Sequence, residues 1–141
     1  MDAQYIQLVM LTRRQCLIIL PLLVPAMSGA TPSLQQAMLR ARALRDQAVR
    51  SGDQPFGAVV LRGDQIVGEA PSRVVTAGDP SAHAEMEAIR DAARRLRSRD
   101  LSGCVLVSTS RPCRMCESAA ASARIERMVH GDALNDAGAP T

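Results

Sequence analysis

Between residue 33 and about residue 70, the hydrophobic pattern changes from helical to extended. A Thr-Pro-Ser start signal at residues 31–33 is followed by apolar side chains at helical spacing, so we expect an amphipathic helix over residues 33–50. Residues 56–61 and 65–70 are largely apolar segments on either side of an Arg-Gly-Asp turn. They predict two strands joined as a β-hairpin.

The second half continues with alternating helices and strands. We expect a loop over residues 71–78, a helix from residues 79–81 to about residue 97, a strand over 104–110, a short Ala-rich helix over 113–123 and a final strand over 127–131. The remaining residues are rich in Gly, Pro and Ala and predict a loose tail. A hairpin followed by crossover connections predicts an α/β fold with three α/β/α layers and a mixed sheet.

The first thirty residues differ in pattern from the rest. Arg13 and Arg14 precede an apolar run over residues 17–24, and small residues follow it. This order predicts a signal peptide of the twin-arginine type over residues 1–30, which would deliver the domain at residues 31–141 to the periplasm or beyond. The apolar run is shorter than the roughly 20 residues that a membrane span needs, so no span is expected.

Two alternatives to export remain open: an N-terminal helix of a cytoplasmic protein, or a true start at Met10. Composition adds little about partners, because the formal net charge of +3 falls to +2 if Arg13, Arg14 and Asp2 leave with the leader. There is no Trp, and one Tyr and one Phe are the only aromatic residues. The core must therefore be built from aliphatic side chains and Met.

Candidate chemistry concentrates in two short stretches, His-Ala-Glu at residues 83–85 and Pro-Cys-Arg-Met-Cys at residues 112–116. His83, Cys113 and Cys116 are residue types that bind Zn²⁺, and three protein ligands leave a fourth position for water, as in a catalytic site. The two cysteines are three residues apart, so on a helix both thiolates would lie on one face. The proline suits the first helical position, and the positive helix end would favour the thiolates.

Glu85 lies two residues after His83 and so projects to a different side of a helix. That offset argues against a fourth ligand and indicates a catalytic carboxylate beside the water. The backbone N–H groups near Ala84 and Cys113 would be free at helix starts, where they could orient a substrate.

Together these residues form the pattern H-x-E … P-C-x-x-C, which resembles the signature of the zinc-dependent nucleobase and nucleoside deaminases. Residues 79–90 and 55–59 are similar to the purine branch of that superfamily, the guanine deaminases and tRNA adenosine deaminases. The resemblance covers about residues 33–132. It implies a cytidine deaminase-like fold, a Zn²⁺ cofactor, and hydrolytic deamination of a free nucleobase or nucleoside, with a guanine-type purine favoured. Members are commonly dimeric, which leaves a homodimer open.

The resemblance also implies the substrate contacts and shows three departures. Phe56, Ser72 and Ala84 are the expected contacts to the substrate. Family members usually carry Asn where Ser72 stands, Glu where Arg111 stands, and a longer segment after the last predicted strand. We therefore expect intact zinc chemistry beside an altered base pocket and a shortened C-terminal part.

Two other functions stay open. One is a zinc-binding deaminase-fold protein without activity. The other is a thiol–disulfide protein, because C-x-x-C at a helix start is also the thioredoxin-like arrangement, although this leaves His83 and Glu85 unexplained. The arginines over residues 90–99 lack interleaved aromatic residues, so we interpret them as a solvated helix face rather than a nucleic-acid site. Cys104 lies within a predicted strand and is expected to be a small buried hydrophobic residue. His130 has no motif around it and is expected to be structural or exposed.

Overall fold

The computed structural model describes residues 33–141; the predicted signal peptide therefore lies outside the described residues. The elements are α2 (Leu34–Arg50), β1 (Gly57–Arg62), β2 (Gln65–Pro71), α3 (Ala84–Leu96), β3 (Cys104–Ser108), α4 (Arg114–Ser122), β4 (Arg127–His130) and β5 (Asn135–Gly138). No helix within residues 33–141 is long and apolar enough to cross a membrane.

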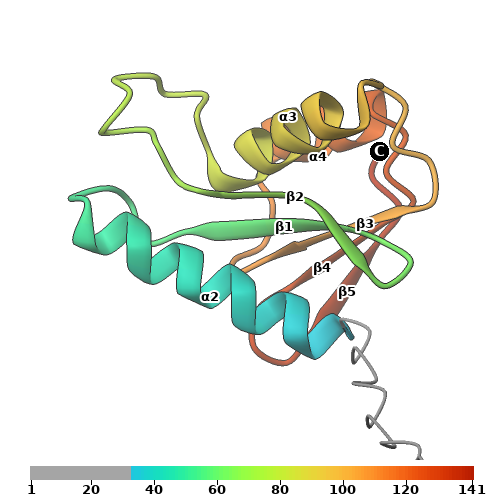
Figure 1. The fold of residues 1–141 in the computed structure, drawn as a ribbon, viewed down its shortest axis with the longest axis horizontal. Helices are drawn as coiled ribbons and strands as arrows, with labels where there is room; N and C mark the ends of the chain where they lie inside the picture. Colours follow the sequence, from blue (N-terminus) through green and yellow to red (C-terminus); the bar gives the residue numbers. More distant parts are fainter. Residues whose placement is uncertain (1–32) are drawn as a thin grey trace, which may run out of the picture.

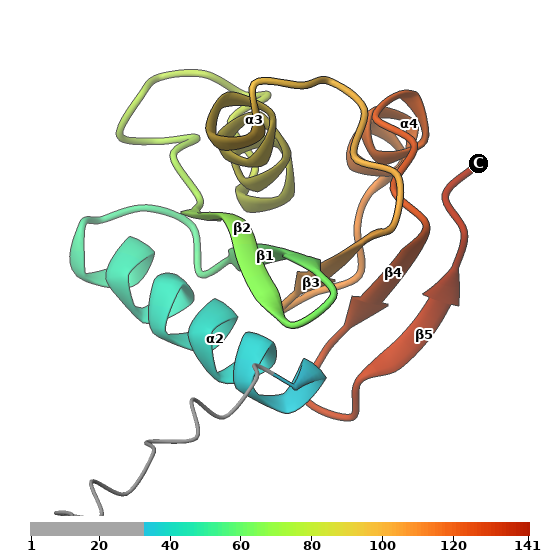
Figure 2. The same ribbon diagram turned by 45° about the vertical axis from the view of Figure 1, so that its right-hand side comes forward.

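The strands form one mixed sheet in the order β2-β1-β3-β4-β5. The β3–β4 pair is parallel, and the other three pairs are antiparallel. Helix α2 covers one face, and α3 and α4 lie together on the other (Figures 1 and 2). The predicted three-layer α/β/α architecture is confirmed.

The central strands are apolar at nearly every position because both of their faces are covered. In β1, Val59 and Leu61 pack in the core shared with α2, whereas Ala58 and Val60 pack in the core shared with α3 and α4. Cys104 is fully buried on the α3 side, as expected for a small hydrophobic residue. Two aliphatic cores, one on each face, therefore fix the helices without aromatic side chains.

Two glycines let the helices approach the sheet closely. A Cβ on Gly57 would lie 2.1 Å from the carbonyl oxygen of Ala41 in α2. A Cβ on Gly68 would lie 2.5 Å from the carbonyl oxygen of Ala88 in α3. Both contacts are with helix backbone, which cannot move aside as a flexible side chain could. Each glycine thus sets the position of one helix against one face.

The predicted boundaries needed three corrections. Residues 132–141 are not a loose tail, because β5 pairs with β4. Helix α3 begins at Ala84, not at residues 79–81, since Asp79 binds the backbone N–H and hydroxyl of Ser81 in a separate turn. Helix α4 begins after Cys113, so the prediction that Pro112 occupies the first helical position was wrong.

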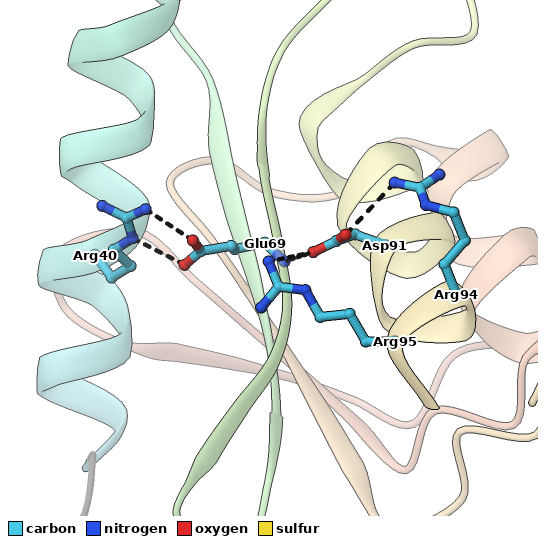
Figure 3. Close-up of polar contacts among 5 residues, drawn as sticks. All are labelled: Arg40, Glu69, Asp91, Arg94 and Arg95. Carbon is cyan, nitrogen blue, oxygen red and sulfur yellow. Dashed lines mark hydrogen bonds and ion pairs between the residues drawn. The ribbon is translucent and has the colours of Figure 1, made fainter. Parts of the chain in front are cut away.

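Charged side chains tie α2 and α3 together across the outer strand β2 (Figure 3). Arg40 of α2 donates to both carboxylate oxygens of Glu69 at 2.7 and 2.8 Å. The Glu69 backbone N–H in turn donates to Asp91 of α3 at 3.0 Å, and Arg94 and Arg95 pair with the same Asp91. Helix α2 on one face of the sheet and helix α3 on the other are thereby connected through one residue of the edge strand, Glu69.

Candidate metal centre and active site

The two predicted stretches meet at the N-termini of α3 and α4. The Nδ1 atom of His83 lies 3.6 Å from the Sγ of Cys113 and 3.6 Å from the Sγ of Cys116. The two sulfur atoms are 3.7 Å apart. Within residues 33–141, His83, Cys113 and Cys116 form a group that could hold a metal ion, since their ligand atoms all lie within 4.8 Å of one another.

The donor set fits zinc in both chemistry and spacing. Zn–S bonds of about 2.3 Å and Zn–N bonds of about 2.0–2.1 Å in a tetrahedron require about 3.8 Å between two sulfurs and about 3.6 Å between sulfur and nitrogen. The observed distances match these edges closely. Three protein donors of this kind leave one corner of the tetrahedron for a water molecule or substrate.

Local helix structure places these donors. His83 and Cys113 are the N-cap residues of α3 and α4, both have extended backbone conformations, and neither side chain caps its own helix. Their donor atoms therefore remain available to an ion. Cys116 lies in the first turn of α4 and is fully buried, whereas Cys113 is exposed.

At Cys116, burial opposes the effect of the helix N-terminus that we expect to favour the thiolate. Burial raises the pKa of the Cys116 thiol, and the neighbouring Glu85 and Cys113 raise it further. The backbone N–H of Met86 lowers it, but by less. Stabilising a thiolate here therefore takes a stronger positive charge than a helix N-terminus, and a divalent cation bound by the sulfur would supply one.

Glu85 lies beside the group without joining it. Its side chain is 4% exposed, and its Oε2 is 3.9 Å from the Sγ of Cys116. Burial raises the pKa of Glu85, although its own backbone N–H, His83 and Cys116 partly oppose the shift. A carboxyl group in this environment can hold or release a proton closer to neutral pH than an exposed glutamate can.

The expected substrate contacts fall into two places. Ala84 is the first residue of α3, where helix N–H groups have no partner inside the helix. Phe56 and Ser72 are joined to each other, since the Ser72 N–H donates to the Phe56 carbonyl at 2.9 Å. Ser72 is buried, and its hydroxyl donates to the carboxylate of Asp53 at 2.8 Å. The structure records no hydrogen bond from Phe56 or Ser72 to the metal-binding group.

Asp53 is a residue that sequence reasoning missed. It lies between α2 and β1, and its side chain accepts hydrogen bonds from four residues. A lone acidic residue in a loop carries no periodic or motif signal. Only its position two residues before Pro55, at the start of a family-like segment, could have pointed to it.

The other singled-out residues lie where the sequence placed them. Arg111 is exposed just before the cysteines. His130 ends β4 and belongs to no metal-binding group found among residues 33–141. Arg90, Arg94 and Arg95 form ion pairs on the surface of α3, in agreement with a solvated helix face.

Comparison with known proteins identifies the same region. The family model described as the cytidine and deoxycytidylate deaminase zinc-binding region matches residues 31–132. A tRNA(Ile)-lysidine synthase of Deinococcus radiodurans is 46% identical over 75% of this chain, and a tRNA-specific adenosine deaminase of Aquifex aeolicus is 42% identical over 62%. The X-ray structure of guanine deaminase from Bacillus subtilis superimposes with a TM-score of 0.66 at 36% identity and covers 69% of the chain.

The matches cover only part of each relative. The chain spans 18% of the lysidine synthase, 59% of the adenosine deaminase and 62% of the guanine deaminase structure. The matching part includes the His-x-Glu and Cys-x-x-Cys stretches that form the metal-binding group.

Proposed function

Because the chain belongs to the family of the cytidine and deoxycytidylate deaminase zinc-binding region, we propose that it is a zinc-dependent hydrolytic deaminase. Its proposed substrate is a free nucleobase or nucleoside, with a guanine-type purine favoured. The observation that carries the proposal is the group formed by His83, Cys113 and Cys116, with the buried carboxyl of Glu85 directly beside it. The guanine deaminase of Bacillus subtilis is the relative that supports a purine base.

In this mechanism His83, Cys113 and Cys116 would hold the metal, and other groups of the chain would have separate tasks. Bound Zn²⁺ would supply Lewis-acid activation of water at neutral pH. Glu85 takes a proton from the water that adds to the amino-bearing ring carbon, and passes protons to the ring nitrogen and to the departing ammonia. The buried position of Glu85 keeps bulk water from competing for that proton.

The N-terminus of α3 contributes to substrate orientation. The Ala84 N–H lies in the first turn of α3, where it has no partner inside the helix, and it can donate to an acceptor atom of the substrate. His83, Ala84 and Glu85 are consecutive, so the metal ligand, the orienting N–H group and the proton carrier would move as one rigid unit.

A second candidate substrate, adenosine in tRNA, is favoured by one observation. Arg73, Arg111 and Arg114 lie on the segments that carry the site, all three are exposed, and none takes part in the ion pairs found within residues 33–141. Free guanidinium groups near a site can bind phosphate. The adenosine deaminase of Aquifex aeolicus is the relative that supports this alternative.

The test is ammonia release by the zinc-loaded protein from guanine, adenine, cytosine, their nucleosides, and an RNA hairpin with an unpaired adenosine. Activity on guanine or guanosine is the expected result. Glu85→Gln should keep its zinc and lose about 10²–10⁴-fold in rate, because glutamine cannot accept the proton. His83→Ala should lose both metal and activity.

Glu126→Gln is the matched control, because Glu126 is exposed and lies outside the metal-binding group. It should match the parent in zinc content and rate. Activity on the RNA hairpin alone would favour the second candidate. A zinc-loaded parent that releases no ammonia from any of these substrates would contradict the proposal and favour an inactive zinc-binding protein.

A further inference from the structure

Asp53 is a buried carboxylate that the proposed chemistry does not use. Its side chain is 8% exposed and takes part in none of the ion pairs found within residues 33–141. Five hydrogen bonds of 2.8–3.1 Å reach its two oxygens; the donors are the backbone N–H groups of Gln54, Val75 and Thr76 and the hydroxyls of Ser72 and Thr76. A buried charge is expensive unless it is paired or hydrogen-bonded, so this set of donors is what permits it.

The electrostatics favour the ionised form of this group. Burial raises the pKa of Asp53, but the hydrogen bonds from Thr76, Ser72 and Gln54 outweigh burial and leave the pKa well below its ordinary value. The carboxylate is therefore an acceptor at both oxygens under all ordinary conditions. Three of its five bonds come from Val75 and Thr76, in the middle of the segment at residues 72–79.

The start of this segment is connected to the site by two hydrogen bonds. The Ser72 N–H donates to the Phe56 carbonyl, and the next N–H, that of Arg73, donates to the carbonyl of Ala82, the residue before His83. Most residues from Arg73 to Gly78 are exposed, so packing contributes little to their conformation. Asp53 supplies the acceptor that the middle of the segment depends on.

We propose that Asp53 is a positioning residue for substrate binding, holding residues 72–79 so that Phe56 and Ser72 stay in register with the His83 end of α3. This inference rests on the proposed function for its kinetic consequence, while the positioning itself can be measured without activity. In this arrangement the Ser72 hydroxyl donates to Asp53, so Ser72 influences substrate binding through the hydrogen bonds around Asp53.

The central test is Asp53→Asn in the full chain, because the amide turns one acceptor into an N–H₂ group that faces donors. Amide exchange at Val75 and Thr76 should accelerate about tenfold or more, and exchange at Ser72 and Arg73 should follow. KM for the best substrate should rise about tenfold or more while kcat and zinc content stay within about twofold, since the metal ligands are not touched. Asp46→Asn, on the exposed face of α2, is the matched control and should match the parent.

Two further variants test whether amide exchange and KM depend on the hydroxyl donor of Thr76. Thr76→Ser keeps both donors and should behave as the parent, whereas Thr76→Val loses the hydroxyl donor and should give a smaller increase in exchange and KM than Asp53→Asn. If Asp53→Asn does not fold, Thr76→Val and Ser72→Ala carry the same test, because each removes one donor.

The outcomes separate this inference from the proposed function. The positioning role would be overturned if amide exchange in Asp53→Asn matched the parent. It would also be overturned if exchange accelerated at Val75 and Thr76 but stayed at the parent rate at Ser72 and Arg73. Faster exchange throughout with an unchanged KM would overturn its link to substrate binding. A parent without any deamination contradicts the proposed function instead, and the exchange pattern still decides whether Asp53 positions the segment.

Discussion

The two buried carboxyl groups of Asp53 and Glu85 have pKa values shifted in opposite directions. Both are desolvated, but hydrogen bonds from Thr76, Ser72 and Gln54 lower the pKa of Asp53, whereas burial dominates at Glu85 and raises its pKa. A group with many fixed donors is held in its charged form, and a group with few can change its protonation state. The environment thus suits Glu85 to proton transfer and Asp53 to a static role.

Asp53 should make the folded state sensitive to acid. Its folded-state pKa lies below its ordinary value of 3.8, so its stabilising contribution is present above about pH 4 and is lost as pH falls towards the folded-state value. At pH 7, Asp53→Asn should lower the free energy of unfolding by about 2 kcal/mol, since hydrogen bonds to charged groups contribute roughly 1.5–3 kcal/mol. Urea unfolding at pH 7, 4 and 3 measures this difference.

The gap between parent and variant should shrink as the pH falls below about 4, because the unfolded parent then binds a proton at Asp53 that the folded parent does not, which favours unfolding. Asp46→Asn should leave the unfolding free energy within about 0.5 kcal/mol of the parent at pH 7, as is usual for exposed positions. A gap that stays constant from pH 7 to pH 3 would show that the Asp53 hydrogen bonds do not depend on its charge.

At the residue level, the sequence predicted the metal-binding group because its chemistry is local and paired. The spacing within each stretch indicates how its side chains lie on a helix. His83 and Cys113 are 30 positions apart, and the resemblance to the deaminase signature is what predicted that the two stretches meet. The bond from Ser72 to Asp53 joins residues that are 19 positions apart and share no motif. Such a contact depends on how two loops meet, which no local pattern encodes.

The helices and strands were predicted where their hydrophobic period is strong. Helix α2 matches its expected range within one residue because Ser33 forms a capping box with Gln36. Strand β5 was missed because Asn, Asp and Gly disfavour strands, and only its pairing with β4 makes it extended. The loop before α3 was mistaken for helix because Asp79 and Ser81 resemble a helix start while forming a turn of their own.

Helix α3 should be displaced by a single added methyl group on strand β2. A Cβ at residue 68 would lie 2.5–2.6 Å from the carbonyl oxygen of Ala88 and from the N and Cβ atoms of Ala92. We expect Gly68→Ala to cost about 1–3 kcal/mol of stability, as overpacking does, and to weaken zinc binding because His83 moves with its helix. Urea unfolding and chelator competition for zinc measure the two effects.

A second substitution distinguishes backbone contact from side-chain crowding. Two of the three atoms nearest to the added Cβ belong to the helix backbone, so Ala92→Gly in the Gly68→Ala background should restore little stability. Full restoration would mean that only the Ala92 methyl group is in the way. A Gly68→Ala protein as stable as the parent would contradict the close approach of α3.

At the scale of the whole molecule, the fold separates its two faces by task. The face covered by α3 and α4 carries the metal-binding group at the N-termini of both helices, and the face covered by α2 carries none of the proposed ligands (Figure 2). The order of elements along the chain was sufficient to predict these layers. The charged connection across β2 was not predictable, because it joins Arg40 to Glu69 through tertiary contact alone.

Export of the whole protein is the remaining expectation from sequence. We expect replacement of Arg13 and Arg14 by Lys to retain the protein in the cytoplasm, because the twin-arginine route distinguishes the two side chains. The measurement is the distribution of a tagged full-length protein between cytoplasm and periplasm, with Gln7→Ala as the control in the same segment. An unchanged distribution would exclude a twin-arginine signal.

The hydrogen bonds and ion pairs that connect α2 and α3 across β2 also limit how molecules of this protein could aggregate. An outer strand recruits another chain through its free backbone donors, but the Glu69 N–H is occupied by Asp91, and Pro71 has no N–H to offer. Charged side chains from both helices further obstruct an approaching strand. Growth of a filament by strand addition needs two receptive edges on every molecule. Because the β2 edge is obstructed, edge-to-edge association of the part that the structure describes, residues 33–141, would stop at a pair.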